Sequence, residues 1–219
     1  MFNLIVRLLL AASLAIAGAN AAADPVRDLV LAAQMDNPSM VKKLLKNGVS
    51  PNTVDPLTGE TVLLLALREG ANDVVKLLIG QPGIDLEQAA PNGNRALMMA
   101  AFKHNKPAVL ALLDKGAIVT YPGWTALHYA AASGDDDIVR ILLDHYAYID
   151  AETPSKLTPL MIAAREGHES AARLLMQEGA DATLKNNESL TAAQIAERAD
   201  KPRIADAINA HLSLTRKGL

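Results

Sequence analysis

The sequence predicts an all-α fold built from stacked helix pairs. The first observation is the motif Thr-x-Leu-x-x-Ala, or a close variant, which begins at positions 61, 95, 125, 158 and 191, so the copies are 34, 30, 33 and 33 residues apart. A fixed period of this size indicates one supersecondary unit repeated along the chain. The second observation is that glycine and proline recur at fixed places within the copies, where they favour helix ends and helix starts.

Each copy predicts a first helix that begins at the motif. The threonine hydroxyl can accept a hydrogen bond from a free backbone N–H of the first turn, and Pro159 stands at the first helical position, where it lacks no needed donor. The leucine and alanines of the motif fall on one face of this helix. Gly70, Gly134 and Gly167 follow nine residues after the motif begins and can take the left-handed conformation that ends a helix.

A second helix is expected directly after each of these turns. Pro38, Pro107 and Pro202 suit its first turn, and apolar pairs such as Leu112-Leu113 form its buried stripe. Glycine ends this helix at positions 48, 116 and 179, but Tyr146 stands in the equivalent place. Because a left-handed tyrosine is uncommon, we expect the loop near Tyr146 to be reshaped.

These motifs resemble the ankyrin repeat. The matching segments are Thr158-Pro159-Leu160 with Gly167-His168, Thr125-Ala126-Leu127-His128 with Gly134, Gly179-Ala180-Asp181, and Gly116-Ala117. The resemblance implies an ankyrin-repeat solenoid of antiparallel helix pairs joined by β-turn fingers. It implies about six repeats, including caps, within a domain of residues 24–219: 27–57, 58–90, 91–120, 121–153, 154–186 and 187–214. The first and last copies depart from the motif, as capping repeats do.

Residues 1–23 are expected to be a secretory signal peptide. Arg7 precedes an apolar or small run from Leu8 to Ala19, and small-x-small cleavage patterns end near Ala21 and Ala23. The run is shorter than the ~20 residues that a membrane anchor needs. With no cysteine in the chain, we expect a protein of the bacterial periplasm that has no membrane attachment after cleavage.

Composition and motifs argue against several function classes. The net charge is −3 and basic residues form no run, so the sequence gives no support to nucleic-acid binding. No P-loop, G-x-S-x-G, H-E-x-x-H or G-x-G-x-x-G motif is present. We therefore expect a monomeric, non-catalytic protein without a cofactor.

The resemblance implies that another protein binds to the concave face, through the finger tips and the residues that precede each first-helix end. The predicted partner-binding residues are Arg68, Glu69, Phe102, Lys103, Tyr121, Trp124, Ser133, Arg165 and Glu166. For the charged residues the alternative is an ordinary solvated face.

The aromatic residues support one part of this surface. Outside residues 1–23 all six lie within residues 102–148, and tyrosine and tryptophan are enriched in interfaces. The same region contains the short interval: Leu113 and Thr125 are 12 positions apart, against 15 or 16 in the other copies. We expect one finger to be shorter by about three residues and to mark the partner's entry. The alternative is that Phe102, Tyr121 and Trp124 pack across this finger.

The expected function is an adaptor or accessory that binds another exported protein. For similar exported bacterial ankyrin proteins this includes support of an oxidative-stress enzyme such as catalase. An immunity protein that blocks a toxin delivered to the periplasm is an alternative within the same class. A different alternative is a metal- or haem-binding protein that uses His104, His128, His145 and the tyrosines of the third and fourth repeats. The resemblance instead implies structural roles for His128 and His168.

Overall fold

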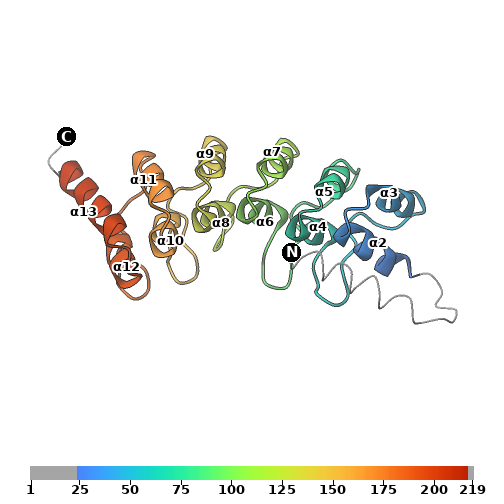
Figure 1. Cartoon of the computed structure of the whole chain (residues 1–219), viewed down its shortest axis with the longest axis horizontal. Coiled ribbons are helices and arrows are strands. Elements are labelled where there is room, and N and C mark those ends of the chain that lie inside the picture. Colours follow the sequence, from blue (N-terminus) through green and yellow to red (C-terminus); the bar gives the residue numbers. More distant parts are fainter. Residues whose placement is uncertain (1–23, 217–219) are drawn as a thin grey trace. The chain divides into compact units, whose positions relative to one another are not determined.

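The computed structural model describes residues 24–216, so the signal peptide predicted for residues 1–23 lies outside them. Within that range there are twelve α-helices and no strand, as the all-α prediction requires (Figure 1). The helices are α2 Pro25–Gln34, α3 Pro38–Lys46, α4 Val62–Glu69, α5 Asn72–Ile79, α6 Ala96–Phe102, α7 Lys106–Asp114, α8 Ala126–Ser133, α9 Asp136–Asp144, α10 Pro159–Glu166, α11 Glu169–Gln177, α12 Ala192–Arg198 and α13 Pro202–Arg216.

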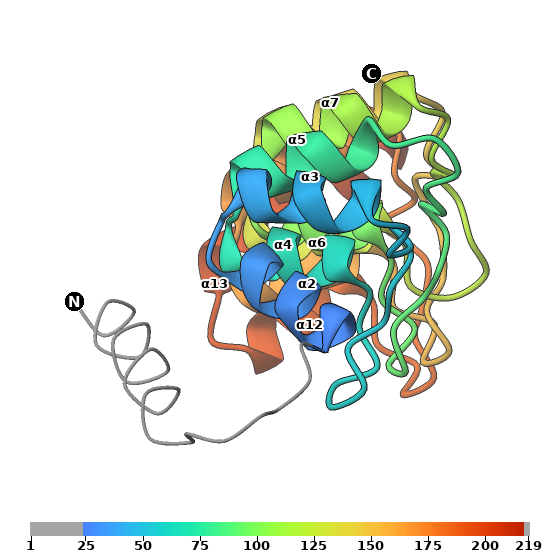
Figure 2. The ribbon, with the colours of Figure 1, turned by 90° about the vertical axis from the view of Figure 1, so that its right-hand side faces the viewer.

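The helices belong to two compact units that divide after Ile84. In the first unit α2 packs against α4 and α3 against α5, so two layers form (Figure 2). In the second unit α6, α8, α10 and α12 pack in succession, and each also packs against the helix that follows it in the chain. We call α2, α4, α6, α8, α10 and α12 the first helices and their partners the second helices. The stacked helix pairs expected from the sequence are thus confirmed within each unit.

The first helices begin and end as the motif predicts. Thr61 Oγ1 accepts a hydrogen bond from the Leu64 N–H at 3.2 Å, and Thr158 Oγ1 accepts one from the Met161 N–H at 3.3 Å. At the other end Gly70 has φ of 71°, a left-handed conformation that suits glycine. The core lies between the helix layers, where apolar side chains such as Leu78 and Leu127 are fully buried and stabilise the fold by their removal from water.

A contact between neighbouring repeats explains why position 134 is glycine. The His168 ring lies against Gly134, where an added Cβ would come within 2.3 Å of Nδ1. His168 Nε2 is 3.0 Å from the carbonyl oxygen of Ala132 in the preceding repeat. Glycine at position 134 therefore allows a histidine of the next repeat to approach the backbone.

The expectation of a reshaped loop at Tyr146 is wrong. Tyr146 has φ of 63°, and its N–H donates to the Leu143 carbonyl at 2.9 Å. Gly116 has φ of 84° and its N–H donates to the Leu113 carbonyl at 2.9 Å, so the two loops share one hydrogen-bonding pattern. The hydrogen bonds hold Tyr146 in a left-handed conformation that a side chain with a Cβ otherwise disfavours.

Three fingers of the second unit share a closed tip. The N–H of the first residue in each tip donates to the carbonyl oxygen of the residue four positions later. The distance is 2.9 Å for Ala90 to Asn94, 3.0 Å for Thr153 to Leu157 and 3.0 Å for Asn186 to Leu190. The fourth residue of each tip, which is Gly93, Lys156 or Ser189, has positive φ. We call these the full fingers. In the described chain no such backbone pair closes residues 118–124, which we call the short finger. Compared with the full fingers, the short finger therefore lacks the residues that form the closed tip.

Candidate functional site

The predicted partner-binding residues lie at the ends of first helices and on the short finger. Arg68 and Glu69 are in the last turn of α4, in the first unit. In the second unit Phe102 and Lys103 end α6, Ser133 ends α8, and Arg165 and Glu166 end α10. Because α8 packs against both α6 and α10, the residues of the second unit share one face.

Three aromatic rings gather on this face. The Phe102 and Tyr129 rings meet edge to face with centroids 5.9 Å apart, and the Trp124 and Tyr129 centroids are 5.6 Å apart. The Tyr129 hydroxyl donates to Asn94 Oδ1 at 2.6 Å, which connects the group to the preceding full finger. We call Phe102, Trp124 and Tyr129 the aromatic cluster. Phe102 remains 47% exposed and Trp124 38% exposed, so the rings pack on one another and still face solvent.

Tyr121 has a different environment. Its hydroxyl donates to Glu87 Oε2 at 2.9 Å, and the Arg95 guanidinium carbon lies 3.8 Å from its ring centroid. Glu87 Oε1 also accepts from the Ile118 N–H at 2.7 Å. Burial and the bond to Glu87 raise the pKa of the Tyr121 hydroxyl. These contacts hold the short finger against the preceding finger, and the partner-binding role of Tyr121 stays a prediction beside this structural one.

The two arginines of the predicted surface are paired locally. Arg68 pairs with Glu60 and with Glu69, and Arg165 Nε is 2.9 Å from Glu166 Oε1. The exposed pair of Arg165 with Glu166 contributes only about 0–1 kcal/mol to stability, whereas Glu60, which pairs with Arg68, is buried. The Arg165 guanidinium can thus exchange Glu166 for a group on another protein.

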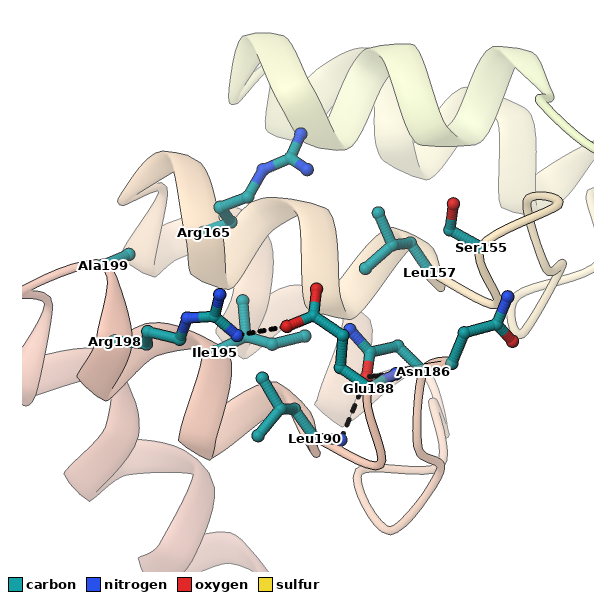
Figure 3. Close-up of a pocket in the computed structure, with 10 residues that line it drawn as sticks. Ser155, Leu157, Arg165, Asn186, Glu188, Leu190, Ile195, Arg198 and Ala199 are labelled. Atoms are coloured by element: carbon teal, nitrogen blue, oxygen red, sulfur yellow. Dashed lines mark hydrogen bonds and ion pairs between the residues drawn. The ribbon is translucent and has the colours of Figure 1, made fainter.

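A groove of about 520 Å³ lies next to Arg165 (Figure 3). Its apolar lining comes from Leu157, Leu190 and Ile195, on two full fingers and α12. Arg198 pairs with Glu188 beside it. Arg165 and Arg198 occupy the same place in successive repeats, 33 residues apart. The groove thus combines apolar walls with two guanidinium groups.

The sequence did not indicate the groove or the role of Tyr129. Leu157 and Leu190 lie outside the repeated motif, and their proximity depends on how two fingers close. The Arg165–Arg198 spacing is the one signal that could have identified this part of the surface. Asn94 and Glu87 carry no motif either, although each accepts a hydrogen bond from a tyrosine of the next repeat.

The histidines of the third and fourth repeats are not gathered at one point. His128 is fully buried, and its ring bonds to Thr125 and, at 3.0 Å, to the carbonyl oxygen of Leu157. Burial lowers the pKa of His128, so the neutral ring is favoured. His104 Nδ1 lies 3.0 Å from Asp135 Oδ2 instead. Among the described residues no three His, Cys, Asp or Glu side chains are placed to hold a metal ion.

Within residues 24–216 no helix is both long enough and apolar enough to span a bilayer.

Comparison with known proteins gives consistent matches. A family model described as ankyrin repeats (3 copies) matches residues 29–122, 83–153 and 119–186. Human SH3 and multiple ankyrin repeat domains protein 2 is 30% identical over 209 residues, covering 78% of this chain and 11% of that protein. The chain spans 21% and 10% of two further relatives, mouse protein fem-1 homolog A-like and protein glp-1 of Caenorhabditis elegans.

Solved structures agree on the fold. The ankyrin repeat domain of Bcl-3, described as a member of the IκB protein family, is 30% identical with a TM-score of 0.68 and covers 80% of each chain. An ankyrin repeat domain from Acinetobacter baumannii is 23% identical with a TM-score of 0.72, covering 84% of this chain and 96% of that one. Ankyrin repeats are generally non-catalytic modules that bind other proteins. This chain belongs to the ankyrin repeat family.

Proposed function

We propose that this protein is a periplasmic adaptor or accessory that binds another exported protein through the first-helix face of its second unit. The aromatic cluster carries this proposal, because Phe102 and Trp124 are large rings that stay exposed although they pack on Tyr129. Rings held in place in this way lose little entropy on binding and can bury a large area.

The groove supplies the second half of the proposed surface. An apolar side chain of the partner fits between Leu157, Leu190 and Ile195, and a carboxylate on the same segment can pair with Arg165 or Arg198. The family relationship supports the protein-binding class. No comparable support favours the metal or haem alternative, because His128 is engaged in the repeat and His104 bonds to Asp135.

Affinity capture from periplasmic extract tests the surface. We expect wild-type protein to retain a partner, and we expect Trp124→Ala and Phe102→Ala to weaken retention at least about tenfold, as loss of an interface hot spot does. Leu110→Ala is the matched control, since Leu110 is 45% exposed on the second helix α7. Equal retention by all four proteins, or no retained partner, would contradict the proposal.

Export is proposed from the sequence of residues 1–23. Cell fractionation with N-terminal sequencing of the recovered protein tests it, and we expect a periplasmic chain that begins near Ala22 or Asp24. An intact Met1 in the cytoplasmic fraction would contradict export and leave the binding surface untouched.

The partner's identity separates two biological versions of the proposal. In the accessory version the partner is an oxidative-stress enzyme such as catalase, and deletion of this gene lowers that enzyme's activity in extracts. In the immunity version the partner is a toxin, and deletion leaves cells sensitive to a neighbouring strain. The gene next to this one, tested for binding to the purified protein, distinguishes the two.

A further inference from the structure

Tyr146 is the most exposed aromatic residue of the described chain. Its side chain is 93% exposed, at a backbone φ of 63°. The equivalent loops place Gly48, Gly116 and Gly179 at this position, and glycine alone takes this conformation without steric cost. Tyr146 therefore contributes neither to core packing nor to the ease of forming the turn. The fold gives no reason for a tyrosine at this position.

Two further apolar side chains lie on the same loops. Ile118 and Tyr148 occupy the same position in successive repeats, two residues after the left-handed residue, and they are 49% and 61% exposed. The Tyr148 N–H donates to Thr120 Oγ1 at 3.3 Å, which joins the two loops. We call Ile118, Tyr146 and Tyr148 the outer patch. It lies after the ends of the second helices α7 and α9, whereas the aromatic cluster lies at the ends of the first helices.

Carboxylates dominate the charges around the outer patch. The loops 114–119, 144–152 and 177–181 carry Asp114, Asp144, Asp150, Glu152, Glu178 and Asp181, against Lys115 and His145. Arg140 on α9 is 3.8 Å from Glu178 and offsets that one group. Asp150 Oδ1 accepts from the Asp181 N–H at 3.0 Å, so two of the acidic residues are neighbours. Burial raises the pKa of Asp150, the bond from the Asp181 N–H lowers it, and repulsion by the Asp181 carboxylate adds a smaller rise.

We propose that the outer patch binds a lysine- and arginine-rich segment of a partner protein. Cationic side chains can stack on the two tyrosine rings while the surrounding carboxylates pair with neighbouring positive charges. A second copy of this chain is a poor occupant, because a two-fold contact would place the acidic loops of one copy against those of the other. The outer patch is thus a second interface, separate from the first-helix face.

A labelled peptide titration tests this proposal. The probe is a fluorescein-labelled peptide of alternating arginine, lysine and leucine, and a peptide of equal length with glutamate in place of the basic residues is the comparison. Anisotropy is measured with the wild-type chain and with Tyr146→Gly and Tyr148→Ala. Leu57→Ala is the matched control, because Leu57 is 92% exposed but belongs to the first unit.

Glycine at position 146 suits the backbone, so Tyr146→Gly is expected to fold at least as well as the wild type in a thermal melt. We expect the basic peptide to bind the wild type and the Leu57→Ala variant equally, and to bind Tyr146→Gly about tenfold more weakly. Added salt should weaken the wild-type complex.

Three results would overturn the proposal: no binding of the basic peptide, equal binding by the Tyr146→Gly variant, or preference for the acidic peptide. Sedimentation of the wild type as a dimer and of Tyr146→Gly as a monomer would also overturn it, because a second copy would then occupy the patch.

Discussion

The short finger and the full finger at Thr153–Leu157 are held in place by different hydrogen bonds. The full finger closes on itself, through the Thr153 N–H to the Leu157 carbonyl at 3.0 Å and the Leu157 N–H to Thr153 Oγ1 at 3.0 Å. The short finger lacks this closure, and its Tyr121 hydroxyl and Ile118 N–H bond to Glu87 of the preceding finger instead. The full finger also bonds to a neighbour, since the Asn187 N–H donates to the Ser155 carbonyl at 3.1 Å, but the short finger has such bonds without a closed turn of its own. Trp124, at the end of the short finger, stays 38% exposed.

Truncation of the helices that lead into the two fingers should have the largest effect on stability. Leu112 on α7 and Leu142 on α9 are equivalent and fully buried. We expect Leu112→Ala and Leu142→Ala to cost similar amounts, about 2–5 kcal/mol each, through lost burial and a cavity. Urea denaturation measures both. A difference between them larger than about 2 kcal/mol would mean that the helices, and not only the fingers, differ.

Removal of Tyr121 should have the next largest effect. Tyr121→Ala removes the bond to Glu87 and the ring beneath Arg95, and we expect it to lower the unfolding free energy by about 1–3 kcal/mol. In the full finger Thr153→Ala removes one side-chain bond, and we expect about 1 kcal/mol. If Tyr121→Ala were neutral while Thr153→Ala destabilised the chain, the short finger would not depend on its neighbour.

Acid should destabilise the start of α8 by a smaller amount, because a protonated His128 ring still donates to the Leu157 carbonyl but no longer accepts from the Thr125 N–H. His128, at the start of α8, bonds to the Leu157 carbonyl of the full finger, and burial lowers its pKa from the ordinary 6.5. The unfolded chain therefore takes up the proton first. The stability from neutral His128 is present above about pH 6.5 and is lost as the pH falls toward the lowered native value. Thermal melts across this range should show a smaller decrease for His128→Gln than for the wild type.

Lengthening the short finger should have the smallest effect on stability. Three residues inserted between Pro122 and Gly123 leave Tyr121 and its contacts in place, and the added loop entropy is below about 0.5 kcal/mol. Binding of the proposed partner should nevertheless weaken, because a restored tip would cover Trp124. Unchanged binding in the capture assay would show that the short finger is not where the partner enters. An equal insertion after Leu57, in an exposed loop of the first unit, serves as the control.

The repeated motif was enough to predict the helix pairs, because Thr158 and Gly167 determine helix ends through local backbone chemistry. The shorter finger was also predictable from the interval before Thr125. The pairing of Tyr121 with Glu87 was not, since it depends on the distance between two neighbouring loops, and Glu87 has no distinctive sequence context. The loop at Tyr146 keeps the hydrogen bonds of the equivalent glycine loops, so residue type at the left-handed position does not by itself predict the loop's conformation.

The hydrogen bonds between neighbouring repeats affect how the chain folds. Those between side chains and the adjacent repeat span 28 residues for Tyr148 with Thr120 and 38 residues for Val74 with Asp36. Each repeat can thus be completed as soon as the next one has formed, without waiting for distant segments. Low sequence separation of this kind favours fast folding, and it allows the process to start within either unit and spread repeat by repeat. Pulse-labelled hydrogen exchange would then show protection that advances in steps of about one repeat.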